Sequence, residues 1–430
     1  PAVVGNGMTA SAALFGAGVG TIVYQLFTKF RSPVFLGSSF AFLGSMFAAF
    51  AGATSMTLGY LGLILGAAFA GLVYVILAIA VKAAGVQWIN KLMPAVVIGP
   101  TVAIIGLSLA GNAVGDMLRG DVTIENVAAA SPNVALLCGL VTLFVVIICS
   151  IFGSKRARLV PFIIGIMAGY AVALAFTLIG MATGNDSLLI IDFAPFKALV
   201  ADGVTLKTFL TLPEFTFVTA LKGVGELNGA YVGAIAVAYV PVAFVVFAEH
   251  IADHKNLSTI INQDLLTDPG LARTLLGDGI GSMAGAFFGG CPNTTYGESV
   301  GCVAITRNAS VVSITGAAVL AMLVAFLSPV VAFLDSIPAC VMGGVCLTLY
   351  GFIAVSGLKM CQDVDLNDNR NLFVVSAILI AGVGGLTLTF GKVTITSVAC
   401  ALILGILVNV VVRRKDHPEG QEHEPQQVIK

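Results

Sequence analysis

Hydrophobic residues form long runs along the whole chain, and short polar segments separate them. Each run is about 20 residues long, the length of α-helix that crosses the hydrocarbon core of a bilayer. Thirteen such runs occur in the 430 residues. We predict spanning segments at 8–28, 33–52, 57–81, 93–113, 131–153, 159–182, 229–250, 272–290, 292–306, 309–334, 338–357, 371–388 and 394–412. The pattern indicates an all-α polytopic membrane protein.

The composition agrees with a body embedded in lipid. Hydrophobic residues make up 58% of the chain and charged residues 10%, whereas soluble domains carry about 25% charged residues. A net charge of −1 provides no basic field, so we expect no nucleic-acid partner. The eight cysteines form no CxxC pair, and we interpret them as small buried hydrophobic residues rather than ligands or redox centres. No cofactor is predicted.

Lys and Arg residues are divided unequally between the two sides of the predicted membrane. Of the 21 cations, all but five lie on one side, and the positive-inside rule makes that side cytoplasmic. The exceptions are Arg119, Lys197, Lys207, Lys222 and Lys392. This division predicts that the C-terminal tail from Arg413 is cytoplasmic. Thirteen spans would then leave Pro1 outside, so we expect one further span before Pro1 and fourteen in the intact protein.

Two segments interrupt the helical pattern in the same way. Segment 32–40 (SPVFLGSSF) and segment 291–299 (CPNTTYGES) each place a proline before a glycine and small polar residues. These residues disfavour a continuous helix, and irregular backbone is tolerated at membrane depth only where it lines protein or a cavity. Segments 93–99 and 337–343 form a second matching pair. The two halves cross the membrane in opposite directions, and such inverted repeats with broken helices are typical of secondary transporters.

Glu249 and Glu298 are the acidic residues that we place within apolar segments; nearly all others fall in predicted loops or the tail. A charge at membrane depth costs about 2.5–3.5 kcal/mol on insertion scales, so both are functional candidates. The alternative is a carboxyl group that reaches water at a helix end. Desolvation favours the protonated carboxyl, and half-helix N-termini supply N–H donors. We therefore predict a pocket for a small planar polar ligand and a coupled proton.

Asp253 follows Glu249 by four residues, so the two share a face if the helix continues. We predict either that Asp253 exchanges a proton with Glu249 or that it ends the helix in solvent. His250 and His254 have the same spacing, which is similar to that of zinc ligands. However, Ile251 stands where an HExxH motif requires Glu, so no metal site is predicted.

Four motifs resemble the nucleobase–ascorbate transporter family, and within it the uracil permease group. They are GSSFAF at 37–42, AEHIADH at 248–254, DLLTDPGL at 264–271 and PNTTYGESVG at 292–301. The resemblance covers residues 14 to 412. It implies fourteen spans in two inverted repeats of seven, with a core domain and a gate domain. It also implies short antiparallel strands in spans 3 and 10, a homodimer in lipid, and an elevator-like movement that imports uracil with a proton.

The resemblance also implies the site. The expected substrate-binding residues are Glu249, Glu298, Phe40, Gly297, Tyr296, Tyr350 and Ser39. In the uracil group the two carboxylates accept the ring N–H groups, and the backbone amides of Phe40 and Gly297 meet the carbonyl oxygens. The tyrosines pack on the ring. Proton coupling is expected at Glu249, Asp253 and Glu298.

The sequence departs from the family pattern at two positions. Asp253 stands where one well-known uracil permease has His, which changes the group that holds the proton, and Ser299 stands where Asn is usual. Xanthine permeases usually carry Gln at the position of Glu298, so the glutamate there favours a pyrimidine as the substrate. A purine permease and an anion transporter of the same architecture remain the alternatives.

The resemblance further divides the chain into parts. The core domain is expected at 1–92 and 229–334, the gate domain at 93–182 and 335–412, an extracytoplasmic connection at 183–228, and the tail at 413–430.

Overall fold

The computed structural model describes residues 4–85, 94–124, 127–201, 203–362, 364–390 and 393–413. Within these ranges it leaves out the side chains of Glu298, Ile305, Phe390, Val393, Thr394 and Arg413. The predictions made for Lys392 and for the tail after Arg413 lie outside the described residues.

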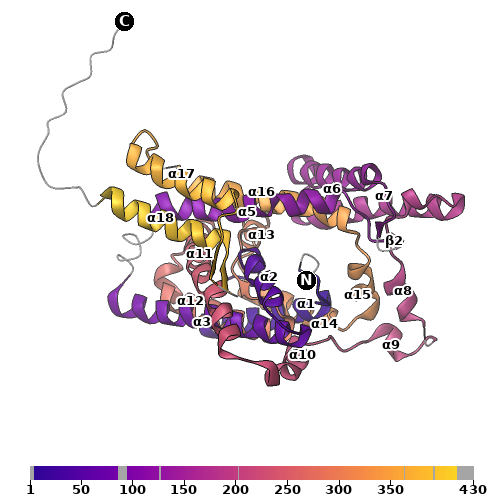
Figure 1. Ribbon diagram of the computed structural model, residues 1–430, viewed down its shortest axis with the longest axis horizontal. Helices are drawn as coiled ribbons and strands as arrows, with labels where there is room; N and C mark the ends of the chain where they lie inside the picture. Colours follow the sequence, from indigo (N-terminus) through magenta and orange to yellow (C-terminus); the bar gives the residue numbers. More distant parts are fainter. Residues whose placement is uncertain are drawn as a thin grey trace, which may run out of the picture.

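Helices account for most of the described chain (Figure 1). They are α1 (Ala10–Phe27), α2 (Leu43–Ala51), α3 (Met56–Ala84), α5 (Ala95–Met117), α6 (Pro132–Phe152), α7 (Pro161–Thr183), α8 (Ala194–Leu199), α9 (Leu206–Phe209), α10 (Thr216–Lys222), α11 (Gly229–Ile261), α12 (Leu271–Gly289), α13 (Gly297–Thr306), α14 (Val311–Val324), α15 (Ser328–Asp335), α16 (Ala339–Met360), α17 (Asn369–Val383) and α18 (Ser397–Arg413). Short 3-10 turns are η1 (Phe40–Phe42), η2 (Ala157–Leu159), η3 (Asp186–Leu188) and η4 (Val224–Glu226). Each predicted span contains at least one of these helices, and the all-α membrane fold is confirmed.

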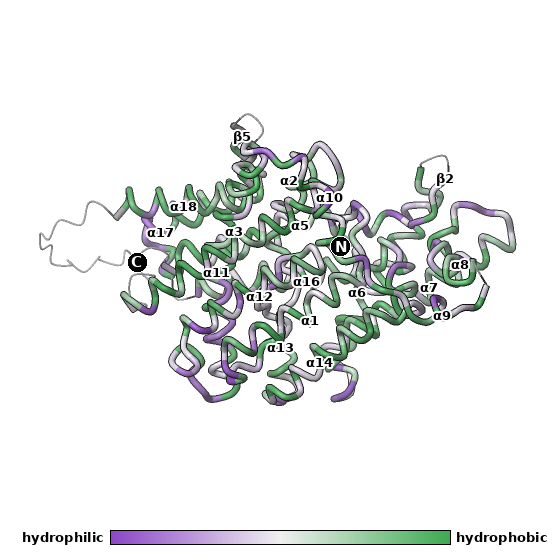
Figure 2. The backbone as a smooth tube through the Cα atoms, turned by 90° about the horizontal axis from the view of Figure 1, so that it is seen from below, coloured by the Kyte–Doolittle hydropathy of each residue, from purple (hydrophilic) through white to green (hydrophobic). Residues whose placement is uncertain are grey.

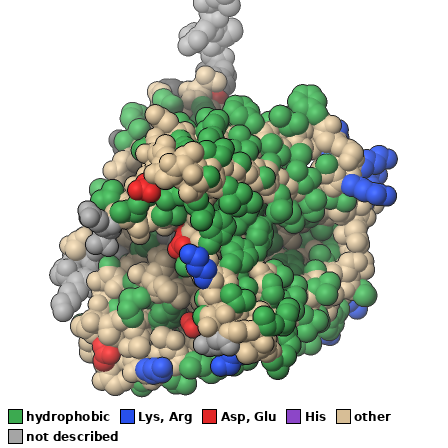
Figure 3. Space-filling view, turned by 90° about the vertical axis from the view of Figure 1, so that its right-hand side faces the viewer, with side chains coloured by type: hydrophobic (Ala, Val, Ile, Leu, Met, Phe, Trp, Pro, Cys, Tyr) green, Lys and Arg blue, Asp and Glu red, His purple; other side chains and the backbone are tan. Residues whose placement is uncertain are grey.

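Seven helices in the described ranges are long and apolar enough to cross a membrane: α1, α3, α5, α6, α7, α11 and α16. The chain is therefore a multi-pass membrane protein. In Figure 2 these helices are mainly hydrophobic, whereas polar residues gather in the loops. The surface in Figure 3 is likewise dominated by hydrophobic side chains, with charges at a few places.

Two predicted spans differ from the helices that the structure contains. The segment predicted at 229–250 continues to Ile261, so α11 carries Glu249 in its interior rather than at its end. The segment predicted at 309–334 divides into α14 and α15. Leu327 between them has an extended backbone, and Pro329 lies in the first turn of α15, where proline is favoured.

The helices pack as two bundles. In the first bundle α12 lies against α1 and α3, α14 lies against α1, and α11 packs on α3. In the second bundle α16 packs on α5 and α6, α7 on α6, and α17 on α5 and α18. Figure 1 shows α1, α3, α12 and α14 in its lower half and α5, α6, α16 and α17 above them.

Glycine allows two helices of the first bundle to approach each other closely. A Cβ at Gly20 of α1 would lie 2.8 Å from the carbonyl oxygen of Gly281 on α12, and a Cβ at Gly281 would lie 2.7 Å from that of Gly20. Because both distances are too short for real atoms, only glycine fits at this crossing.

Three pairs of short antiparallel strands accompany the helices: β1 (Gly37–Ser38) with β4 (Asn293–Thr294), β2 (Thr123–Ile124) with β3 (Val127–Ala128), and β5 (Leu388–Phe390) with β6 (Val393–Ile395). The first pair joins the two segments that were predicted to interrupt their helices. We call segment 32–40 the first break and segment 291–299 the second break. Gly37 lies opposite Thr294 and Ser38 opposite Asn293. The predicted antiparallel strands of the broken spans are therefore confirmed, although the two segments are more than 250 residues apart in the sequence.

Candidate functional site

A cavity of about 340 Å³ lies where the two broken segments meet. Such a volume is typical of a site for a small molecule. One wall comes from the breaks and α11, and the other from α5, α7 and α16 of the second bundle. The lining residues are Gly37, Ser38, Ser39, Phe40, Ala41, Ile105, Phe162, Glu249, Thr294, Tyr296, Val345, Leu349 and Ile353.

Polar side chains of α1 hold the first break in an extended form. Gln25 donates from Nε2 to the carbonyls of Ser32 and Val34, at 2.9 and 3.0 Å. The amide of Leu36 donates to Oγ1 of Thr21 at 2.9 Å. These bonds replace the helical partners that a span around Pro33 lacks.

The second break is tied to α1 and to the first break. Nδ2 of Asn293 donates to the carbonyl of Gly16 at 3.0 Å, and the amide of Ser39 donates to the carbonyl of Pro292 at 3.0 Å. A Cβ at Gly37 would lie 2.7 Å from Cε1 of Tyr296, so a side chain at this position would displace the tyrosine ring.

Each break is followed by the N-terminus of a helix at the cavity. Ser39 precedes the turn η1, which leads into α2, and Tyr296 precedes α13, whose first residue is Gly297. The first amides of a helix have no partner within it, and they carry partial positive charge. The predicted donors at Phe40 and Gly297 therefore belong to two helix starts beside the cavity.

Glu249 is half-buried on α11 and lines the cavity. Asp253 lies one turn further along the same helix and is 9% exposed. A Cβ added at Gly297 would lie 3.9 Å from Oδ1 of Asp253. Because the helix continues, the shared face predicted for the two carboxylates is confirmed, and Asp253 does not end the helix in solvent.

A larger cavity of about 610 Å³ adjoins the first one. Glu249, Phe162 and Ile353 line both cavities. The larger cavity also touches Asp253 and Gly297, and it extends along the connection between α6 and α7 as far as Arg158. The larger cavity therefore lies between the smaller one, with which it shares these lining residues, and the connection between α6 and α7.

The remaining predicted residues lie close by. Tyr296 lines the smaller cavity, whereas Tyr350 of α16 is 2% exposed and packs edge-on against Phe40, with ring centroids 5.2 Å apart. Ser39 is buried and lines the cavity. Glu298 is the second residue of α13, and its side chain lies outside the described part of the structure.

Sequence reasoning missed the wall that the second bundle contributes. Val345, Leu349 and Ile353 recur every four residues on one face of α16 and line the smaller cavity with Ile105 and Phe162. The spacing was visible in the sequence, but apolar residues at helical spacing are as typical of a helix packed against other helices as of a helix that lines a cavity.

The sequence interpretation was wrong about the intramembrane acids. Asp278 lies inside α12 and is 0% exposed, so it is a third carboxyl group within the apolar body. Its signal was available, because an acid stands within a predicted span among Gly277, Gly279 and Gly281. His250 and His254 are also completely buried, and their nitrogen atoms contact protein groups.

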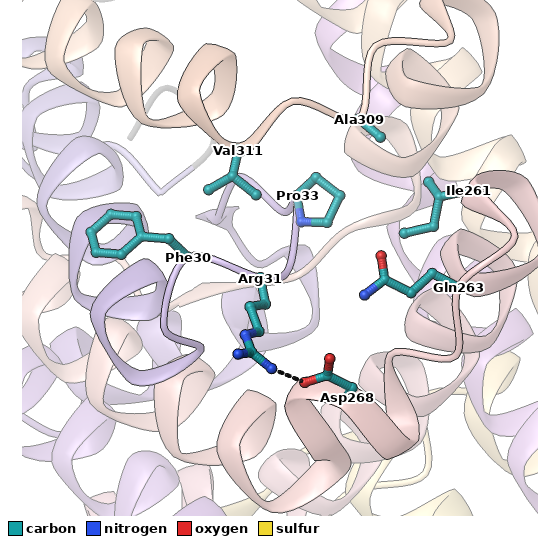
Figure 4. Close-up of a pocket in the computed structure, with 8 residues that line it drawn as sticks. All are labelled: Phe30, Arg31, Pro33, Ile261, Gln263, Asp268, Ala309 and Val311. Atoms are coloured by element: carbon teal, nitrogen blue, oxygen red, sulfur yellow. Dashed lines mark hydrogen bonds and ion pairs between the residues drawn. The ribbon is translucent and has the colours of Figure 1, made fainter.

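A further hollow of about 440 Å³ is separate from these cavities. It lies between the loop after α1, the end of α11 and the loop before α14 (Figure 4). Arg31 and Asp268 form an ion pair of 2.8 Å at its edge, and their side chains are 57% and 53% exposed. It contains none of the predicted site residues.

Comparisons with known proteins agree with this architecture. The family model described as the Permease family, of xanthine and uracil permeases, matches residues 1–391. The chain is 38% identical to the uracil permease of Bacillus caldolyticus over 94% of this chain and 86% of that protein. It is 33% identical to the uracil permease of Escherichia coli K12 over 92% of this chain and 83% of that protein.

Two solved structures share the fold. The transmembrane domain of the cyanobacterial bicarbonate transporter BicA superposes with a TM-score of 0.57 at 14% identity, covering 95% of this chain and 96% of that one. SLC26A9 superposes with a TM-score of 0.53 at 10% identity, covering 94% of this chain and 63% of that one. These superpositions support the predicted inverted-repeat architecture of seven plus seven spans.

Proposed function

Because the chain belongs to the nucleobase–ascorbate transporter family of permeases, we propose that it imports uracil across the bacterial inner membrane together with a proton. It is a transporter and not an enzyme. One observation carries the choice of ligand: a half-buried carboxylate, Glu249, and the starts of two helices adjoin the same small cavity.

The cavity offers the groups that a pyrimidinedione requires. Uracil has ring N–H groups that donate and carbonyl oxygens that accept. We assign Glu249 and Glu298 as the acceptors for the N–H groups, and the amides of Phe40 and Gly297 as the donors to the carbonyls. Tyr296, Tyr350 and Ser39 complete the proposed binding site. A buried ligand loses affinity when such groups stay unpaired, so the pairing also selects against other ring systems.

Proton coupling follows from the same carboxylates. Glu249 faces both cavities, and Asp253 lies one turn away beside Gly297. A carboxyl group out of water is more easily protonated, and a protonated acid changes from acceptor to donor. We assign Glu249, Asp253 and Glu298 as the groups among which the coupled proton moves.

Transport requires the site to face the two sides of the membrane in turn. We propose that the first bundle carries the site and slides along the second, which corresponds to a core domain of 1–92 and 229–334 and a gate domain of 93–182 and 335–412. The apolar residues of α16 suit a sliding surface, because they form no specific bonds to the site. A homodimer would hold the second bundles still in the lipid, with the C-terminal tail in the cytoplasm.

The coupling is tested in proteoliposomes that contain the purified protein. Uptake of radiolabelled uracil should rise when the external solution is made more acidic than the interior, and a protonophore should abolish the increase. Uptake that is the same with and without the proton gradient would contradict the symport. Competition by a panel of pyrimidines and purines distinguishes a uracil carrier from a purine carrier.

The site is tested by Glu249→Gln, which keeps the size of the side chain and removes its charge. We expect equilibrium uracil binding to fall by more than about ten-fold, since an acceptor oxygen is replaced on one side by an amide donor. Glu226→Gln is the matched control, because Glu226 lies outside the cavities and contacts Ser55 and Thr54. Equal affinity in both variants would show that the site is wrongly placed.

A further inference from the structure

The two histidines of α11 are not accounted for by the proposed transport mechanism. His250 directly follows Glu249, His254 directly follows Asp253, and both imidazoles are 0% exposed. Their ring centroids are 4.1 Å apart. Buried polar groups of this kind are retained only with partners, so their contacts indicate what they do.

His250 is bound on both nitrogens. Nδ1 lies 2.6 Å from Oδ2 of Asp278, and Nε2 lies 3.0 Å from Oγ1 of Thr274. The Thr274 hydroxyl donates its hydrogen to the carbonyl of Leu271 at 3.0 Å. With that hydrogen on the carbonyl of Leu271, Thr274 accepts from His250, and this assignment places a proton on Nε2.

The second contact requires a proton as well. A separation of 2.6 Å between Nδ1 and Oδ2 is a hydrogen bond only if one hydrogen lies between the two atoms. The pair thus holds two protons, one on Nε2 and one shared between Nδ1 and Oδ2. Whether the shared proton is closer to nitrogen or to oxygen, the net charge of the pair is zero. Neutrality is what permits both groups to lie at 0% exposure.

Asp278 joins the two elements that carry the site. Through His250 it is bonded to α11 next to Glu249. The backbone amide of Thr295, in the second break, lies beside Asp278, whose Oδ1 has no hydrogen-bond partner among the described residues. Thr295 is followed by Tyr296 and Gly297, so one side chain on α12 lies against both α11 and the second break, which together form one wall of the proposed substrate site.

His254 extends the network to the other break. Its Nδ1 faces the carbonyl of His250 at 2.8 Å and therefore carries a proton, because a carbonyl only accepts. Its Nε2 lies 2.8 Å from the hydroxyl of Tyr24, which is 2.7 Å from Oγ of Ser32. Ser32 immediately precedes Pro33 and the first break.

We propose that His250 and Asp278 form a neutral positioning pair that orients Glu249 and the second break and keeps both of its protons throughout transport. The inference rests on the proposed function, because it assumes the uracil site. The other titratable groups around the pair are Tyr74 of α3, Tyr24 of α1, and Glu249, Asp253 and His254 of α11. Loss of a proton from the pair would add a negative charge among carboxyl groups away from water, which is the physical reason for its retention.

Asp278→Asn and Asp278→Ala test the proposal, with Asp268→Asn as the surface control. Asparagine can donate from Nδ2 to Nδ1 of His250 and keeps the pair neutral, whereas alanine removes the bond. We expect Asp278→Asn to bind uracil within about two-fold of the unmodified protein and to keep its response to the proton gradient. We expect Asp278→Ala, measured on protein that elutes as a single peak in size-exclusion chromatography, to lose more than about ten-fold in affinity.

Three results would overturn the positioning pair. They are unchanged affinity in Asp278→Ala, a large loss of affinity in folded Asp278→Asn, and uracil uptake by Asp278→Asn that no longer responds to the proton gradient. The last result would make the pair the coupling site instead. Because the asparagine variant decides two of these outcomes, the test holds even if the alanine variant does not fold. Absence of uracil binding by the unmodified protein would contradict the proposed function instead.

Discussion

Among the contacts between a basic side chain and a carboxylate in the described residues, two of nearly the same length have opposite surroundings. His250 and Asp278 are 2.6 Å apart with both side chains 0% exposed. Arg31 and Asp268 are 2.8 Å apart with side chains 57% and 53% exposed. The first pair lies between α11 and α12 beside the proposed site, and the second lies at the edge of an open hollow (Figure 4). The comparison shows that distance alone does not indicate the importance of a polar pair.

Solvent is the cause of the difference. Water competes for Arg31 and Asp268, and dissolved ions screen them, so pairs of this type contribute about 0.2–1 kcal/mol. Water does not reach His250 and Asp278, so removal of one partner leaves the other buried and unpaired. That penalty is about 3–5 kcal/mol for buried pairs. Each of the following predictions tests this contrast.

The largest effect is expected for His250→Leu, which keeps a similar volume and leaves Asp278 without its main partner. We expect the free energy of unfolding to fall by about 3–5 kcal/mol. Thermal unfolding in detergent, followed by size-exclusion chromatography or intrinsic fluorescence, measures the change. A loss below about 1 kcal/mol, the range of an exposed pair, would mean that burial does not distinguish the two contacts.

The double variant His250→Leu with Asp278→Leu should be more stable than His250→Leu alone. Apolar replacement of both members of a buried pair is often close to neutral, because no polar group is left unpaired. We expect the second substitution to restore at least about 2 kcal/mol. Uracil binding should remain weak in the double variant, since stability returns without the bond that positions Glu249. Recovery of both properties would contradict the positioning role.

Arg31→Gln should have a small effect. The Asp268 carboxylate remains in contact with water after the substitution, so we expect the stability to change by less than about 1 kcal/mol. The uracil uptake rate should stay within about two-fold of that of the unmodified protein. A larger loss of stability would show that the exposed pair has a structural role that its surroundings do not suggest.

Ionic strength should give the smallest effect and the sharpest contrast. Raising the salt concentration from about 0.01 M to about 1 M shortens the screening length from about 30 Å to about 3 Å. The stability difference between Arg31→Gln and the unmodified protein should disappear over this range. The difference for His250→Leu should persist, because buried pairs are screened much less.

Much of the fold could be predicted from sequence, because the bilayer imposes one length and one polarity on every spanning helix. The two breaks could be predicted as well, since Pro33 and Pro292 each precede small polar residues. Other features depended on packing. The continuation of α11 through Glu249 and Asp253 has no local signal, because the segment after Ala248 is polar and a helix end was equally compatible with it.

The candidate site was predictable where one residue type is costly in its surroundings. Glu249 was found because a carboxyl group at the end of an apolar run requires an explanation, and Asp278 offered the same signal but was overlooked. The apolar wall of Val345, Leu349 and Ile353 could not be found, because apolar residues on a membrane helix face lipid, protein or ligand without a difference in pattern.

The sequence by itself determined that the chain is a polytopic helical membrane protein, that two spans are broken, and which motifs assign it to a family. These properties follow from local chemistry: hydrocarbon requires apolar helices, and proline and glycine interrupt them. Only the tertiary structure decided that β1 pairs with β4, that α16 completes the cavity, and that His250 lies against Asp278. Such contacts join residues far apart in the chain, and their partners are chosen by how the helices pack against each other.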